Sequence, residues 1–348
     1  MAKIHCLASG IGLSANALTA LAQERDGKPI AFSEFPTTGG LTFALDGAGY
    51  VNAPFTGAFS VAPTFTVDHN GSSFLLRSEN LKQQFTIKVL PLPSFIGTDG
   101  SRPFGAAMIT HADRVRLSPV NGCAYSCGFS DLHYSAYEIF GKDTLLEALH
   151  VAIRDPVLPA RHALISGGTP KIKDQQRLDE IYEYILSQSP IPVDVMVAPR
   201  LQDAGFIKRL FDWGTYGFAI NIELFGESRR EIVPQKAALG LRPYSKAIEE
   251  AVALTGGNGR VRSLLVVGLE PRELTLRGVK WLAERGCNPV LSPFRPATGT
   301  SLEKHPIPSA QFLAELWVDA HEITEKHGVK IGPVCIPCQH NDLSFPEP

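Results

Sequence analysis

After about residue 112, β-forming segments alternate with amphipathic segments, and this alternation constrains the fold more than any other feature of the sequence. In the amphipathic segments, apolar residues recur at helical spacing. Strands separated by helices of this length form right-handed βαβ units, so the sequence predicts a parallel sheet. The predicted strands are Arg114–Pro119, His162–Ser166, Val193–Ala198, Gly217–Glu223, Arg262–Val267 and Pro289–Pro293. The predicted helices include Gln175–Ser187, Ala237–Ala253, Glu273–Glu284 and Ser309–His327.

Six strand–helix units favour an α/β fold, and specifically a partial parallel (β/α)6 TIM-like barrel. We expect this barrel, with a C-terminal extension, to occupy residues 110–348. In barrels of this type the active site lies at the C-terminal ends of the strands. Polar or unusual residues that follow the predicted strands are therefore the first candidates for a functional site.

Residues 1–100 are predicted to form a small β-rich N-terminal region. Short β-forming runs there alternate with Gly, Pro, Asn and Asp, a pattern typical of antiparallel strands. The runs are Leu41–Leu45, Phe65–His69, Ser73–Arg77 and Gln84–Leu90. The Pro- and Gly-rich stretch Pro91–Pro103 is predicted to be a linker between the two parts.

The composition predicts a globular protein with an ordinary packed core. Of the 348 residues, 44% are hydrophobic and 20% are charged. The formal net charge of -2 provides no electrostatic attraction for nucleic acid. No apolar run approaches the ~20 residues that span a bilayer, and the N-terminus lacks a signal-peptide pattern. We therefore expect a cytoplasmic protein with neither a nucleic-acid nor a membrane partner.

The six cysteines are unevenly distributed along the chain. Cys123 and Cys127 form one close pair and Cys335 and Cys338 another, while the remaining two are isolated. In a cytosolic chain of this length, clustered cysteines indicate metal binding or catalysis rather than a disulfide framework.

The first pair lies in the loop Gly122–Asp131, directly after the first predicted barrel strand. Iron–sulfur clusters are held by cysteine thiolates, which must converge when they come from one short loop. Cys123 and Cys127, four residues apart in a glycine-containing loop, satisfy this requirement for two irons. The alternative is that both are small apolar residues that fill a core.

Two further strand ends carry candidate ligand-binding groups. Paired glycines in Ser166–Pro170 allow a ligand to approach the backbone closely, although a plain turn could have the same sequence. The predicted strand Gly217–Glu223 also ends in polar residues, and strand alternation places Asn221 and Glu223 on the same side of it. Arg229 or Arg230 could then bind a carboxylate. Glu223 could equally be an exposed carboxylate that pairs with Arg229.

The cysteine loop resembles the radical S-adenosylmethionine (radical SAM) signature, Cys-x3-Cys-x-aromatic-Cys. Cys123, Cys127 and Phe129 match the signature, and Ser130 stands at the position of the third cysteine. Four further segments, in the same order along the chain and within roughly residues 112–300, resemble other elements of this family. They are most similar to those of biotin synthase and lipoyl synthase. They are Gly167-Gly168-Thr169-Pro170, the Asn221-x-Glu223 strand end with its downstream arginines, the segment around Gly268, and the loop Pro293–Thr300.

The resemblance implies a specific chemistry. A [4Fe–4S] cluster would be held by Cys123 and Cys127, with Ser130 at the third ligand position. When reduced, it would cleave SAM to a 5′-deoxyadenosyl radical that abstracts hydrogen from a small-molecule substrate. The implied partner is an electron donor such as flavodoxin or ferredoxin. The implied SAM-binding residues are Phe129, Gly167, Gly168, Thr169, Asn221, Glu223, Arg229, Arg230 and Gly268.

Ser130 is the departure from this pattern, because a serine hydroxyl is rarely ionised and is a poor iron ligand. Three explanations follow. The chain is an altered form of a cysteine-bearing enzyme, or a serine alkoxide ligates iron, or the cluster has been lost. In the last case the chain is a cluster-free barrel that binds SAM or another metabolite without radical chemistry.

The second cysteine pair lies in the C-terminal segment Gly332–His340. A Cys-x2-Cys pair is common in zinc and iron–sulfur sites but normally needs further ligands. His340 and Cys287 are candidates for these ligands. The alternative is a substrate-facing or structural terminus near the mouth of the barrel.

Overall fold

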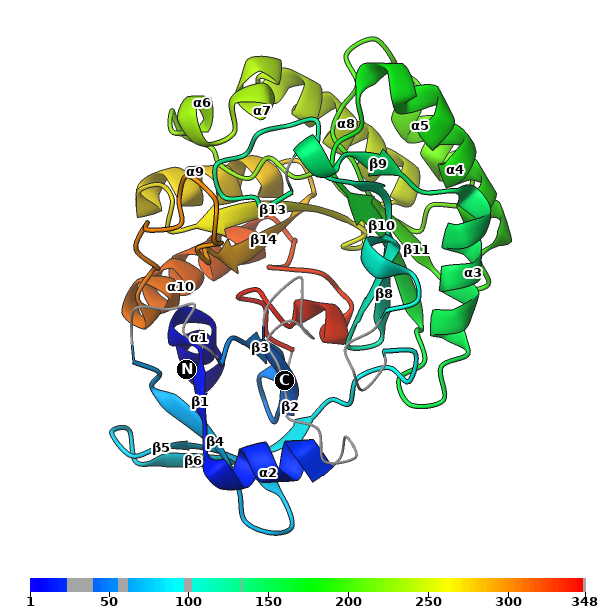
Figure 1. The fold of residues 1–348 in the computed structure, drawn as a ribbon. Helices are drawn as coiled ribbons and strands as arrows, with labels where there is room; N and C mark the ends of the chain where they lie inside the picture. The colour runs from blue at the N-terminus through cyan, green and yellow to red at the C-terminus, as the bar shows by residue number, and fades with distance from the viewer. Residues whose placement is uncertain (24–39, 56–61, 97–101, 133, 347–348) are drawn as a thin grey trace.

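The computed structural model describes residues 1–23, 40–55, 62–96, 102–132 and 134–346. Its larger sheet is curled and contains a continuous run of parallel strands in the spatial order β14-β13-β12-β11-β10-β8 (Figure 1). These strands are β8 (Arg114–Asn121), β10 (His162–Gly167), β11 (Val193–Met196), β12 (Gly217–Ala219), β13 (Val261–Val267) and β14 (Asn288–Pro293). An antiparallel strand, β7 (Met108–His111), extends this sheet beyond β8, and the short β9 (Glu138–Ile139) pairs with the end of β8. The predicted α/β fold with a parallel, curled sheet is confirmed.

Helices follow the parallel strands and cover the convex face of the sheet (Figure 1). Their apolar sides and the strand residues that face them, such as Leu117 and Ile165, form one continuous buried core. Helices α3, α5 and α6 are not among the predicted helices, and α7 and α8 occupy the place of the single predicted helix Ala237–Ala253. Gly240, with φ 71°, separates these two helices. The helices are α3 (Lys142–Ile153), α4 (Gln175–Gln188), α5 (Phe206–Asp212), α6 (Arg229–Ile232), α7 (Pro234–Leu239), α8 (Leu241–Thr255), α9 (Arg272–Ala283) and α10 (Ala310–Lys326).

The N-terminal region forms a second sheet with the strand order β1-β4-β5-β6-β2-β3. The predicted antiparallel pairing holds for β2 to β6, but β1 pairs parallel with β4. This exception arises because the chain between β1 and β4 passes through α2 and the β2–β3 hairpin, a crossover long enough for parallel pairing. Residues 24–39, 56–61 and 97–101, which include parts of the predicted β-rich region and linker, lie outside the described residues. The elements are α1 (Ala2–Ser9), β1 (Ile11–Leu13), α2 (Ala15–Gln23), β2 (Leu41–Leu45), β3 (Gly49–Ala53), β4 (Phe65–His69), β5 (Phe74–Ser78) and β6 (Gln83–Val89).

The C-terminal tail lies between the N-terminal sheet and the concave side of the barrel (Figure 1). Backbone hydrogen bonds join it to β14, where Leu343 N donates to Leu291 O, and to β3, where Asn52 N donates to His340 O. The fully buried Lys3 of α1 donates to two tail carbonyls, Gln339 O at 2.8 Å and Ser344 O at 2.6 Å. The tail is therefore part of the core between the two sheets.

Replacement of Lys3 is expected to destabilise this junction. Lys3→Met keeps most of the side-chain volume but leaves two buried carbonyl oxygens without their charged donor. We expect the free energy of unfolding to fall by about 2–4 kcal/mol. Lys208→Met is the matched control, because Lys208 forms an exposed pair with Asp212 and should change stability by less than about 1 kcal/mol. Equal stability of the two variants in chemical denaturation would contradict the assignment.

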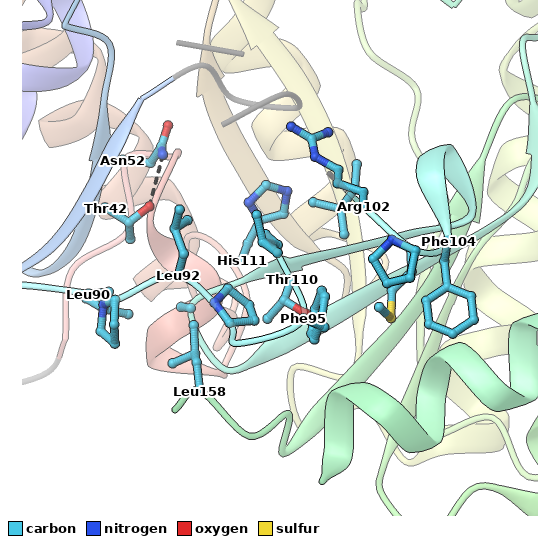
Figure 2. Close-up of a pocket in the computed structure, with 17 residues that line it drawn as sticks. Thr42, Asn52, Leu90, Leu92, Phe95, Arg102, Phe104, Thr110, His111 and Leu158 are labelled. Atoms are coloured by element: carbon cyan, nitrogen blue, oxygen red, sulfur yellow. Dashed lines mark hydrogen bonds between the residues drawn. The ribbon is translucent and has the colours of Figure 1, made fainter. Parts of the chain in front are cut away.

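A small, mostly apolar cavity of about 40 Å³ lies where the segment after β6 crosses the β7–β8 hairpin (Figure 2). Its lining includes Leu90, Phe95, Phe104, His111 and Leu158. A water molecule needs about 10–15 Å³ of such volume, so this cavity has room for only a few waters. In the part of the chain that the structure describes, no helix has the length and apolar character needed to cross a bilayer.

Candidate functional site

The candidate site is a cavity of about 330 Å³ at the C-terminal edge of the parallel strands. Cys123 follows β8, Gly167 ends β10, Asn221 follows β12 and Gly268 follows β13. Because these strands are parallel, all four positions lie at the same edge of the sheet. This is the arrangement that the order of the sequence motifs predicts.

The structure brings most of the predicted site residues together around this cavity. Those that line it are Cys123, Cys127, Phe129, Ser130, Gly167, Gly168, Thr169, Asn221 and Glu223. They come from three regions of the barrel, at or after the ends of β8, β10 and β12. The lining also includes residues that the sequence analysis did not single out: Tyr125, Gln175, Tyr182, Met196, Arg200, Phe206 and Lys236.

The cysteine loop is held against the loop that follows β10. Ala124 N donates to Thr169 O at 2.9 Å, and Thr169 N in turn points to Cys123 Sγ at 3.1 Å. Burial raises the pKa of Cys127 to about 11, although the nearby Lys236 ammonium acts in the opposite direction. Without a metal, this thiol is therefore neutral at physiological pH. The Ser130 hydroxyl accepts a hydrogen bond from Leu132 N at 3.3 Å.

The paired glycines permit this contact between the two loops. A Cβ on Gly168 would lie 1.6 Å from Gly122 O, and one on Gly167, where φ is 129°, would lie 2.7 Å from Val120 O. Side chains at these positions are thus excluded by backbone atoms that cannot rotate away. The pair has a packing function as well as a place in the cavity wall.

Gly168→Ala is therefore expected to separate the two loops and to distort the cavity. The added methyl group must displace the backbone at Gly122, so we expect a loss of about 2–4 kcal/mol in unfolding free energy and weaker binding of any ligand in the cavity. Gly141→Ala is the control: Gly141 has φ -69°, and an added Cβ would meet only Thr144 Oγ1, at 3.7 Å. Thermal melts of both variants, with ligand binding as a second readout, test this; similar melting temperatures would exclude the tight contact.

A buried ion pair lies on the β12 side of the cavity. Lys236 Nζ donates to Glu223 Oε1 at 2.7 Å and to Asn221 O at 2.9 Å. Burial by itself lowers the pKa of Lys236, but the charge of Glu223, together with Tyr244, the Glu223 hydrogen bond and Cys127, outweighs burial and raises this pKa overall. Glu223 has a positive φ of 64°, which is uncommon for a residue other than glycine and is often retained at functional sites. As alternation predicts, Ile222 faces the core and its two neighbours face the cavity.

Three predicted ligand contacts lie elsewhere: among the described residues, the cavity lining does not include Arg229, Arg230 or Gly268. Arg229 is buried and donates to Lys236 O at 3.1 Å, and Arg230 is exposed. Gly268 packs against Pro308. Lys236 supplies a cation to the cavity instead, and no motif around it in the sequence pointed to this position.

Arg200 provides a second cation at the cavity, but it is already paired. Its guanidinium lies 2.7 Å from Asp179 Oδ1 and over the ring of Phe206, at 3.5 Å from the centroid. This double contact fixes the plane of the guanidinium group. Arg200 therefore places a guanidinium group of fixed orientation in one wall of the cavity.

The C-terminal cysteine pair lies at the other end of the barrel, so the prediction of a terminus near the barrel mouth is wrong. Cys338 Sγ lies 3.4 Å from Nδ1 of His162, the first residue of β10. The tail contacts β14 and β3 along its length, which holds the pair at the N-terminal ends of the strands. His340 stacks on His111, and the Cys287 thiol faces Asn288 O, so neither predicted partner joins the two cysteines.

Comparisons with known proteins give similarity in fold only. No family model matches the chain, and no curated protein matches it in sequence. Among solved structures, the [FeFe]-hydrogenase maturase HydG from Carboxydothermus hydrogenoformans aligns with 62% of this chain and 52% of its own, at 18% identity and a TM-score of 0.47. HemN from Escherichia coli, described as a radical SAM enzyme, aligns with 63% of this chain and 54% of its own, at 16% identity and a TM-score of 0.40.

A third similar structure is Streptococcus suis SuiB bound to S-adenosylmethionine. It aligns with 64% of this chain and 51% of its own, at 17% identity and a TM-score of 0.45. The chain thus spans about half the length of these three proteins. Because the identities are this low, the residues at the barrel mouth must carry the functional conclusion.

Proposed function

We propose that this chain is a radical SAM enzyme that acts on a small molecule at the C-terminal mouth of its barrel. One observation carries the proposal. The two cysteines of the signature-like loop, the glycine pair after β10 and the Asn221-x-Glu223 strand end line a single cavity. These motifs are spread over about a hundred residues of sequence, and the parallel order of β8, β10 and β12 brings them to one edge of the sheet.

The donor set fits an iron–sulfur cluster at two of its three protein positions. Cys123 and Cys127 both line the cavity, and thiolates are the usual ligands of such clusters. Ser130 lines it as well, so its hydroxyl is available at the third position. The raised pKa of Cys127 does not oppose this assignment, because a metal ion deprotonates a coordinating thiol. The third ligand is the weak point of the set, since oxygen is a poorer ligand than sulfur for these irons.

The remaining lining provides polar groups for SAM. Two of the three N–H bonds of Lys236 are taken by Glu223 and Asn221, which leaves one for a ligand carboxylate. We therefore assign to Lys236 the role that the sequence suggested for Arg229 or Arg230. Gly167, Gly168 and Thr169 offer backbone groups for the methionyl amine. Aromatic and apolar residues, including Tyr182 and Phe206, form walls suited to a purine ring.

When bound, the reduced cluster would supply the electron that cleaves SAM and so allows hydrogen to be taken from an unactivated carbon. The protein residues would orient SAM and keep water away from the reacting atoms. A small-molecule substrate and a one-electron donor, such as a flavodoxin or ferredoxin, complete the proposed reaction.

Anaerobic reconstitution with iron and sulfide tests the assignment. We expect the full-length chain to turn brown, to retain iron and sulfide after desalting, and to bind SAM in equilibrium dialysis. A Cys123→Ala, Cys127→Ala double variant should retain neither iron nor sulfide. The isolated buried cysteine gives a matched control, Cys6→Ala, which should behave like the unaltered chain. Iron retention that does not depend on Cys123 and Cys127 would contradict the proposal.

A cluster-free barrel that binds SAM or another metabolite is the second candidate. Ser130 at the third ligand position favours it, because a hydroxyl is a poor iron ligand. In that case the unaltered chain would bind SAM with equal affinity before and after reconstitution, and it would retain no iron.

A further inference from the structure

A second group of metal-binding side chains lies at the opposite end of the barrel from the SAM cavity. Cys335 Sγ, Cys338 Sγ and a ring nitrogen of His162 all lie within 4.8 Å of one another. His162 begins β10, whereas Gly167, at the end of the same strand, lines the SAM cavity. The two groups are thus separated by the length of the strand and cannot share one metal.

One distance within the group matches the ligand spacing around a small tetrahedral ion. With Zn–S near 2.3 Å and Zn–N near 2.0 Å, tetrahedral ligands lie about 3.6 Å apart for N and S and about 3.8 Å apart for two S atoms. Cys338 Sγ lies 3.4 Å from His162 Nδ1, close to the first value. A Cys-x2-Cys turn is a common source of two zinc ligands. Here the turn is the short 3-10 helix η5 (Ile336–Gln339), and Cys335 is the residue before it.

The far side of the imidazole provides an independent observation. His162 Nε2 lies 3.2 Å from Asp194 Oδ2, and this carboxylate in turn lies 2.5 Å from Arg262 Nη1. Asp194 is buried, so its charge is directed at these two partners. A carboxylate on the far side of the imidazole is the usual arrangement behind a zinc-bound histidine, whose other ring nitrogen, here Nδ1, then binds the metal.

Two cationic or ionisable side chains, Arg114 and His162, act electrostatically on the Cys338 sulfur. The thiolate is the form of cysteine that binds metals. One further acidic group is nearby: the buried Oδ1 of Asp113 has no hydrogen-bond partner among the described residues, and its charge acts on Cys335.

We propose that His162, Cys335 and Cys338 bind a zinc ion at the N-terminal end of the barrel strands, with Asp113 or water as the fourth ligand. Two thiolates and an imidazole in a tetrahedral arrangement suit zinc better than calcium or magnesium, which prefer oxygen. The ion joins the C-terminal tail to β10 and so fastens the tail that fills the space between the two sheets. Its role is structural and independent of SAM cleavage.

Metal analysis of the full-length chain, purified with reductant and dialysed against metal-free buffer, tests this site. We expect one zinc ion per chain, reduced at least tenfold in a Cys335→Ser, Cys338→Ser double variant and in His162→Asn. Asp194→Asn keeps all three ligands and should weaken zinc retention by 10- to 100-fold. Cys287→Ala is the control: it removes a buried cysteine near Arg262 and should retain the ion.

The Cys123→Ala, Cys127→Ala variant separates this proposal from the proposed function, since it should lose iron and keep zinc. If the tail variants fail to fold, Co²⁺ added to the metal-stripped unaltered chain serves instead. Thiolate-to-cobalt charge-transfer bands are then expected, and Zn²⁺ should abolish them. The proposal is overturned if the unaltered chain retains no zinc and gives no such bands. It is also overturned if peptide mapping shows a Cys335–Cys338 disulfide in freshly reduced protein, or if these cysteines hold iron in place of zinc.

Discussion

Ser130→Cys is expected to raise the iron content of the anaerobically reconstituted chain toward about four ions per chain and to increase formation of 5′-deoxyadenosine from SAM. The substitution restores a third thiolate beside Cys123 and Cys127, in a cavity that these residues already line. A thiolate holds iron more strongly than a hydroxyl, so occupancy and reduction potential should both change. Iron and sulfide analysis, with nucleoside quantification after dithionite addition, measures the effect.

Cys127→Ala provides the opposite case and should abolish both iron binding and SAM cleavage. Ser126→Cys is the positional control, because it also adds a thiol to the same loop but outside the cavity. Ser126 N and Oγ are hydrogen-bonded to Gln235, and Ser126 is not among the described residues that line the cavity. A full cluster in the unaltered chain that Ser130→Ala removes would identify serine as a working ligand. Absence of iron and of SAM cleavage in Ser130→Cys would exclude the radical mechanism.

Lys236→Met is expected to lower the free energy of unfolding by about 3–5 kcal/mol, because it leaves the Glu223 carboxylate buried without its cation. It should also weaken SAM binding, since the proposed carboxylate partner is lost. The double variant Lys236→Met, Glu223→Gln should recover part of the stability, because no uncompensated charge then remains, but it should not recover SAM binding. Chemical denaturation and equilibrium dialysis measure the two effects separately.

The exposed pair Lys326–Glu322 provides the control for this experiment. Both side chains are about two-thirds exposed, so Lys326→Met should change stability by less than about 1 kcal/mol. If Lys236→Met lowered the free energy of unfolding by no more than Lys326→Met, the Lys236–Glu223 pair would not be a buried ion pair. The assignment of Lys236 to the SAM site would then fail as well.

The barrel could be predicted from the sequence because its signals are local. Strand segments such as His162–Gly167 are short apolar runs, and helices such as α9 have apolar residues at regular helical spacing. Helix α5 has only seven residues, too few for its periodicity to stand out. The parallel pairing of β1 with β4 was missed because a crossover leaves no local mark in either strand.

Only some of the residues in the two candidate sites could be predicted from the sequence. Cys123 and its loop were predictable, since this loop directly follows a predicted barrel strand. Lys236, in contrast, lies on helix α7, and only the folded structure shows that its ammonium meets Glu223, 13 positions earlier in the chain. His162 lies at the start of a strand, where function is not expected in a barrel, and Cys338 of the tail that meets it is 176 positions away in the sequence.

Reductive cleavage of SAM by the unaltered chain is the most direct test of the central claim. The anaerobically reconstituted protein is incubated with SAM and dithionite, and 5′-deoxyadenosine and methionine are quantified over time. The proposed function predicts that both products form in equal amounts, and that the Cys123→Ala, Cys127→Ala variant forms neither above the protein-free background. If the unaltered chain and Ser130→Cys both bind SAM yet neither releases 5′-deoxyadenosine, the radical SAM assignment is contradicted.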